Sequence, residues 1–433
     1  MPVLKLMKRF ALAVGVVSWL AARASAQQPP VADVVEGGGL KVSEGTVLHP
    51  VLGVEAGVVH NIFYEDSSPV LSGVMRVIGE IAVGSLPPER LQAPTEQDSA
   101  TRNYGNLAFR LDVHAQYEEY LSSNNDVQAQ RNFSYAALAQ GLVYPHQTWQ
   151  FGFSDELRRE TRPVNFESPQ DVDRDINRLA LQLRYRPAGR RISGSLGYQN
   201  VIDYFEDETQ QFANRMQHTV ALNVGWQWLP MTRIFGDASL GFFRPLGDDS
   251  TRIPSMPLRV MAGIASALTV KTQVLGSIGF GKGFYETGPD FTNVVGGLQF
   301  GYRYSPQARL AAAYEYDFHD SINANFYRDH ALKLRMEQQI DRFAFTAAAE
   351  LRFRLYRGVI AEVMGMGMET DRTDLIFSVP VGATYNFRNW IAATLDYRLT
   401  IDETDFRYSV GGSVFDDPSY TRQSLMAGVR AAY

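Results

Sequence analysis

The sequence contains no cysteine among its 433 residues. This absence excludes a disulfide framework, and it also excludes a lipid anchor attached to a cysteine. After the first 26 residues no stretch reaches 18 apolar residues, so no membrane-spanning helix is predicted. The seven histidines are scattered without metal-binding spacing, and no cofactor or metal site is predicted. A chain of this kind that crosses a membrane must do so as a closed β-barrel.

Residues 1–26 have the three regions of a secretory signal peptide, in the expected order. Lys5, Lys8 and Arg9 are followed by a short apolar core over 10–22 and by small residues up to Ala26. We expect cleavage near Ala26, a periplasmic lead-in over 27–44 and a barrel over 45–433. The segment removed carries four basic residues and no acid, so the formal net charge falls from −6 to −10. This acidic balance disfavours binding to nucleic acid.

From residue 45 onward, apolar and polar residues alternate with a period of two. Residues 107–118, 178–186, 219–228, 343–354 and 391–400 show the pattern most clearly. Such strands have one apolar and one polar face, as the strands of membrane barrels do. We predict an all-β, closed antiparallel transmembrane barrel of about 18 strands, with 16 to 18 compatible, over 47–63, 69–83, 105–120, 131–144, 147–159, 174–187, 190–204, 215–229, 231–245, 256–269, 271–285, 291–304, 307–319, 325–338, 341–356, 375–388, 390–403 and 420–433.

The connections between these strands alternate in length. Tight turns are expected at 144–147, 187–189, 229–231, 305–307, 340–341 and 388–389, and longer acidic loops at 160–173, 205–214, 246–255, 357–374 and 404–419. Short periplasmic turns that alternate with long external loops are typical of outer-membrane barrels. The long 84–104 connection departs from this pattern and is either a periplasmic excursion or an additional hairpin.

Aromatic residues stand beside the short turns, where an interfacial girdle belongs; the alternative is the ordinary preference of aromatics for strands. They are Trp149, Tyr185, Trp226, Trp228, Tyr302, Tyr304, Tyr385 and Trp390.

The last stretch, 423–433, places Leu425, Ala427, Val429, Ala431 and Tyr433 on one apolar face. It resembles the closing strand of a Gram-negative outer-membrane barrel, which pairs with the first strand so that no edge faces lipid. The alternative is the terminal strand of a soluble sheet. The resemblance implies contact with outer-membrane lipid and recognition by the barrel assembly machinery.

The polar faces of the strands are rich in arginine, whereas the acids lie largely in the loops. If the apolar face meets lipid, the polar face lines a lumen, and barrels of 16–18 strands can hold a water-filled channel. The alternative is that these charges pair across strands and only solvate the wall. We predict a lumen lined by Arg110, Asp112, Arg178, Arg184, Arg186, Arg303, Lys333, Arg335, Glu350, Arg352, Arg354, Asp396 and Arg398. No catalytic residue is predicted.

Residues 57–66, which include Asn61 and Phe63, lead through Pro69 to Ser72 and Gly73. This hairpin resembles the opening hairpin of the β-barrel porin families that include barrels of exopolysaccharide and capsule export systems. The resemblance implies export of a polysaccharide through the lumen, together with a periplasmic polysaccharide export protein. A general diffusion porin for small solutes is the alternative, followed by an outer-membrane enzyme and an adhesive barrel.

Overall fold

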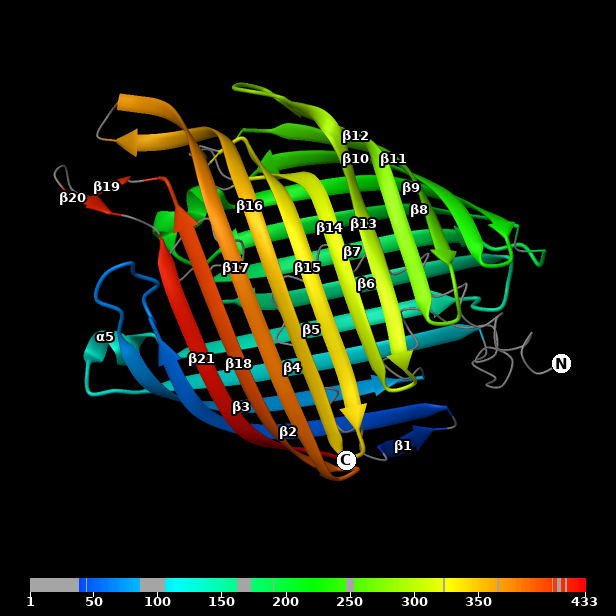
Figure 1. Cartoon of the computed structure of the whole chain (residues 1–433), viewed down its shortest axis with the longest axis horizontal. Coiled ribbons are helices and arrows are strands. Elements are labelled where there is room, and N and C mark those ends of the chain that lie inside the picture. Colours follow the sequence, from blue (N-terminus) through cyan, green and yellow to red (C-terminus); the bar gives the residue numbers. More distant parts are fainter. Residues whose placement is uncertain are drawn as a thin grey trace.

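Eighteen strands of the computed structural model pair edge to edge into one closed antiparallel barrel (Figure 1). The structure describes residues 39–43, 45–85, 106–161, 173–189, 191–246, 253–321, 324–363, 366–406, 408–410, 414–416 and 419–433. The expected signal peptide, most of the lead-in and nearly all of the 84–104 connection lie outside these residues. No helix among the described residues has the length and apolar character needed to span a membrane.

The strands of the barrel follow the chain order, and each pairs with its sequence neighbours. They are β2 (Thr46–His60), β3 (Leu71–Gly84), β4 (Leu107–Leu121), β5 (Asn132–Val143), β6 (Trp149–Glu160), β7 (Arg174–Tyr185), β8 (Ile192–Phe205), β9 (Arg215–Leu229), β10 (Thr232–Pro245), β11 (Ser255–Ala267), β12 (Thr272–Tyr285), β13 (Phe291–Ser305), β14 (Ala308–Asp320), β15 (Phe326–Ile340), β16 (Phe343–Val363), β17 (Met366–Arg388), β18 (Ile391–Thr404) and β21 (Tyr420–Ala432). The prediction of a closed 18-strand barrel is confirmed.

The closing strand β21 pairs with β18 on one edge and with β2 on the other. Val54 stands opposite Val429, and His60 opposite Gln423, so the two ends of the sheet are joined along most of β2. Figure 1 shows red β21 beside blue β2. The short strand β1 (Leu40–Ser43) also pairs with β2, beyond the point where β21 ends. The predicted closing strand is therefore present.

The short turns lie at one end of the barrel, which we call the short-turn end; it also holds β1 and the C-terminus. The opposite, long-loop end carries the short helix α5 (Asn125–Ala129), the 3-10 helix η1 (Glu208–Ala213) and the hairpin of β19 (Tyr408–Val410) and β20 (Val414–Asp416). None of these four elements was predicted, and β1 was also missed. All are short and lack the two-residue period over a useful length.

The predicted loop over 357–374 is wrong for most of its length. The ladder between β16 and β17 continues from Val359 opposite Thr370 to Val363 opposite Met366. A register shift between Tyr356 and Val359 interrupts the alternation, and Gly358 there adopts a positive φ of 69°. Glycine tolerates this backbone conformation, which allows the bulge. Because the bulge breaks the alternation, the two-residue period does not reveal that the strand continues beyond it.

The two faces of the barrel wall differ in polarity, as predicted. Large apolar side chains are exposed on one face of the strands, for example Val113 (54%), Leu222 (50%) and Leu298 (55%). Trp149, Trp226, Trp228 and Trp390 are exposed beside the short turns. The exterior of the barrel is therefore an apolar band with exposed aromatic residues at the short-turn end.

Candidate functional site: the inner wall of the barrel

The face opposite the apolar band forms the inner wall, and contacts between strands that are not neighbours identify it as the inside. Arg259 on β11 places its Nε atom 2.9 Å from Oδ1 of Asp317 on β14. Strands β12 and β13 lie between them in the sheet. Side chains separated by two strands can meet only on the concave face of a curved sheet, which in a barrel is the inside.

All thirteen residues predicted to line the lumen occupy this side of their strands, because they share the alternation of buried inner-wall residues such as Ala108, Ala331 and Ala392. Most of them are bound to carboxylates or cations. Arg110 binds Asp112, Arg178 binds Glu156, Lys333 binds Glu315, Arg335 binds Glu337, and Arg352 binds both Glu350 and Asp329. Arg178, Lys333 and Arg352 thus pair with an acid on a neighbouring strand, as in the alternative interpretation, whereas Arg110 and Arg335 pair with an acid on their own strand.

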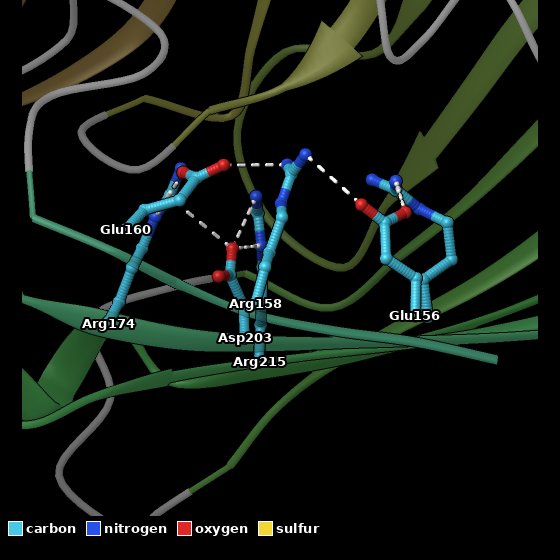
Figure 2. A network of polar contacts seen from close by, with 7 residues as sticks. Glu156, Arg158, Glu160, Arg174, Asp203 and Arg215 are labelled. Atoms are coloured by element: carbon cyan, nitrogen blue, oxygen red, sulfur yellow. Dashed lines mark hydrogen bonds and ion pairs between the residues drawn. The ribbon is translucent and has the colours of Figure 1, made fainter. Parts of the chain in front are cut away.

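A continuous polar network covers the inner wall of β6 to β9 near the long-loop end. Figure 2 shows how the side chains reach across four neighbouring strands. Arg174 binds Glu160 at 2.8 Å and Asp203 at 3.3 Å. Arg215 binds the same carboxylate of Asp203 at 2.7 Å, and Arg158 binds Glu160 at 2.7 Å. Because Asp203 and Glu160 each bind two arginines, the network holds the four strands in one register.

A second network joins the first strands of the barrel to the closing strand. Glu55 on β2 accepts hydrogen bonds from Arg430 on β21 at 2.6 Å and from Arg76 on β3 at 3.0 Å. Arg76 also donates from Nε to Glu118 on β4 at 3.0 Å. The side chains of Glu55 and Glu118 are only 1% exposed. This bridge spans four strands, including the pair that closes the barrel.

A third network fills the inner wall of β15 to β17 at the long-loop end. Arg354 makes two hydrogen bonds to Asp329, and its guanidinium lies 3.8 Å from the ring centroid of Tyr327. Arg372 binds Asp374 at 2.7 Å. The side chain of Arg354 is completely buried. Arg354 was predicted to line the lumen, but in this structure it is enclosed within the wall and presents no surface to a solute.

Three inner-wall arginines near the short-turn end differ from all of these. Arg184 donates to the side-chain oxygen of Gln182 at 2.6 Å, and Arg233 donates to Asn223 at 3.0 Å. The positive charge of Arg186 repels the positive charges of both Arg184 and Arg233. Among the residues that the structure describes, none of the three has a carboxylate within salt-bridge distance, and the acid that acts on Arg233 is Asp237, through the shared side chain of Asn223. We call Arg184, Arg186 and Arg233 the arginine trio.

The sequence brings two of the trio together on β7 and the turn that follows it, and Arg233 joins them from β10. Gly225 on β9 makes room for Arg233, because a Cβ atom there would lie 2.0 Å from the Nε atom of Arg233. The two-residue period indicates the inner-wall position of all three. It does not indicate which of them forms a salt bridge, because that depends on the register between strands.

The interior is open along β13 to β15 toward the short-turn end. Three successive residues, Leu298, Gln299 and Phe300, are all exposed, although Gln299 points inward. The inner-wall side chains of Arg309 and Arg335 are 64% and 58% exposed. In a filled core the inward residues would be buried. The barrel therefore encloses accessible space at this level.

Arg303 belongs to the same region and is also exposed, whereas Asp396 and Arg398 are half-buried on the inner wall of β18.

Charged groups at the end of β6 and in the neighbouring loops form a separate cluster at the long-loop end. Arg159, at the end of β6, binds Glu206 and Asp173. The hydrogen bond from Arg159 holds the pKa of Glu206 below its usual range, whereas burial raises the pKa of Asp173. Within the described part of the chain, no group of three or more His, Asp or Glu side chains could hold a metal ion.

No protein-family model matches the chain, and no curated protein matches it. Among solved structures the chain is similar to OccK2 (OpdF) of Pseudomonas aeruginosa, with 11% identity, a TM-score of 0.45 and coverage of 92% of this chain and 99% of that one. It is similar to OccAB3 of Acinetobacter baumannii, with 9% identity, a TM-score of 0.44 and coverage of 90% and 100%. A BenF-like porin from Pseudomonas fluorescens Pf-5 has 9% identity, a TM-score of 0.44 and coverage of 89% and 99%.

Proposed function

We propose that the chain is an outer-membrane pore that passes small anionic solutes by diffusion. The observation that carries this proposal is the arginine trio, none of whose members forms a salt bridge with a described carboxylate, so that the trio leaves net cationic charge on the inner wall. The closed barrel supports a membrane location, because closure pairs the first strand with the last and leaves neither as a free edge in the lipid. The exposed apolar band and the tryptophans at the short-turn end support the same location.

The distribution of charge supports selection for anions. Arg178 and Arg352 are bound to acids, so their fields are largely cancelled within a few ångströms. Arg184 and Arg186 are not cancelled in this way, and Arg233 is only partly offset by Asp237, with which it shares the side chain of Asn223. Uncompensated charge in a narrow, low-dielectric passage attracts counter-ions strongly. A guanidinium also binds carboxylate groups in a two-point geometry. The favoured solutes are therefore small molecules that carry a carboxylate.

The filling of the long-loop end supports small solutes over a polymer. Arg354, Tyr356 and Phe318 lie on or against the inner wall there, and each is at most 1% exposed. Packed side chains reduce the free cross-section of the passage. A polysaccharide chain needs a wide, continuous conduit, whereas a small anion needs only a narrow one. Export of a polysaccharide with a periplasmic partner protein stays a prediction, as do the enzyme and adhesin alternatives.

The experiment is a flux measurement with purified protein in liposomes. Swelling rates are compared for lactate and gluconate, for neutral sugars of similar size, and for an anionic oligosaccharide of about ten units. We expect the small anions to enter faster than the neutral sugars and the oligosaccharide to be excluded. Equal rates for anions and neutral sugars would contradict the anion preference. Entry of the oligosaccharide would favour export, and a protein without any flux would shift the function to an enzyme or an adhesin.

A further inference from the structure

The barrel wall has a seam between β13 and β14 at the long-loop end. These strands pair from Ser305 opposite Ala308 up to Gly296 opposite Tyr316, and there their ladder stops. Both strands continue beyond that point. Residues 291–295 stay paired with β12, and residues 317–320 stay paired with β15. Along the seam, two strand edges that could pair with each other are separated.

Above the seam, β14 leans onto the inner wall of β11 and β12. The Oγ atom of Ser255 donates to Oδ1 of Asp320 at 2.7 Å, and the hydroxyl of Tyr285 donates to the same oxygen at 3.1 Å. Arg259 binds Asp317 at 2.9 Å. We call residues 317–320 the flap; their partners 326–329 on β15 stay paired with β16. Polar contacts from two other strands hold the flap inside the barrel.

Phe318 shows that the flap has left the position expected from the alternation of the strand. Tyr314, four residues earlier on the same face, is exposed on the outside. Phe318 is completely buried instead. Its ring stacks on Phe291 at a centroid distance of 4.1 Å, and the guanidinium of Arg259 lies 4.2 Å from its centroid. An outward-facing residue has thus been carried to the inside.

Two glycines of β12 make this position of Phe318 accessible. A Cβ atom on Gly281 would lie 2.8 Å from the Phe318 ring, and one on Gly283 would lie 3.0 Å from it. Side chains at these positions would displace the ring. The run of glycines in β12 therefore has a specific role in the wall, which is to leave a recess for the flap.

The sequences of β13 and β14 also allow a second arrangement, in which the two strands pair along their full length in the same register. If the ladder continued above Gly296 and Tyr316, Val294 would stand opposite Phe318. Phe318 would then lie beside Val294, which is 52% exposed on the outer face. The missing ladder hydrogen bonds would form, while the Phe318 stack and the contacts of Asp317 and Asp320 would be lost. The inward arrangement gives the flap its side-chain contacts, and the outward arrangement gives it ladder hydrogen bonds instead. An element with two alternative sets of contacts can occupy either of two positions.

We propose that the flap is a gate, which narrows the passage when it lies inside and widens it when β14 zips onto β13. This inference rests on the proposed pore function. The inward position adds Phe318 and the backbone of β14 to the interior at the long-loop end. The outward position returns that volume to the passage and restores a continuous wall.

The test uses engineered cysteine pairs, which is direct because the chain has no cysteine of its own. The double variant S255C/D320C captures the inward position, and V294C/F318C captures the outward position. V260C/F280C is the matched control, since these residues stand opposite each other on β11 and β12 in the ladder of this structure. Pairs of opposed strand residues come close enough for a disulfide or a short thiol cross-linker. Each variant is reconstituted in planar bilayers and measured cross-linked and then after reduction.

We expect all three pairs to cross-link. Cross-linking should lower the conductance of S255C/D320C at least twofold, raise that of V294C/F318C, and leave the control unchanged. G281A should also raise the conductance, because its methyl group displaces Phe318. Failure of V294C/F318C to cross-link while the control does, or equal conductance before and after reduction in both test variants, would overturn the gate. A protein whose control variant shows no conductance would instead refute the pore function, so the two failures are distinguishable.

Discussion

Arg354 and Asp329 face each other across β16 and β15 and form two hydrogen bonds, from Nε at 2.8 Å and from a terminal nitrogen at 2.9 Å. The arginine side chain is completely buried, and the aspartate side chain is 7% exposed. A buried pair of this geometry stabilises a register, because removal of one partner leaves a charge without compensation in a poorly solvated place.

This relationship predicts a large penalty for the single variant R354M. We expect it to lower the free energy of unfolding by about 3–5 kcal/mol, because Asp329 then keeps only Arg352 as a cationic partner. The double variant D329L/R354M should lose less than the single one, since no buried charge remains unpaired. The measurement is urea unfolding in lipid vesicles. A double variant less stable than R354M would show that the ion pair itself supplies net stability.

The bridge around Glu55 predicts an order of effects. Arg76 serves two carboxylates that are 1% exposed, Glu55 and Glu118. The variant R76M should therefore cost about 3–5 kcal/mol of unfolding free energy. R430M should cost less, because Glu55 keeps Arg76. The same urea assay checks the ranking, and the reverse order would mean that the closing strand depends on Arg430 more than the contacts indicate.

The faces of the wall are tested by two adjacent residues on β13. Leu298 and Gln299 are both exposed, one to the outside and one to the interior. L298R should cost about 2–4 kcal/mol if the site lies at the bilayer midplane. Q299R should cost much less, because its side chain enters the aqueous interior. Similar losses from both variants would show that the interior is not accessible to water at this level.

The strands were readable from the sequence because a two-residue period runs through nearly all of them. β9 (Arg215–Leu229) begins and ends where the pattern placed it. The alternation also assigned Arg110, Arg184 and Glu350 to the inner wall. Such assignments need only the local pattern, which each strand carries by itself.

What the sequence could not supply is the register between strands. Register decides that Arg354 meets Asp329 and is buried, while Arg184 meets no carboxylate. It also decides that Phe318 leaves its expected face, because the recess at Gly281 and Gly283 lies on another strand. The bulge at Gly358 hid the continuation of β16 and β17 for a related reason. At Phe318 and at the bulge, contacts between strands override the local alternation.

The arginine trio should make the passage selective for anions, and the reversal potential in a salt gradient measures this selectivity most directly. Wild-type protein and the triple variant R184Q/R186Q/R233Q are compared in planar bilayers with a tenfold gradient of potassium chloride. The control is the double variant E156Q/R178Q, which removes a bound arginine together with its carboxylate and so leaves the net charge of the wall unchanged. We predict an anion-selective reversal potential for the wild type and for E156Q/R178Q, and a shift toward zero or toward cation selectivity for the triple variant. An identical reversal potential in all three proteins would contradict the account.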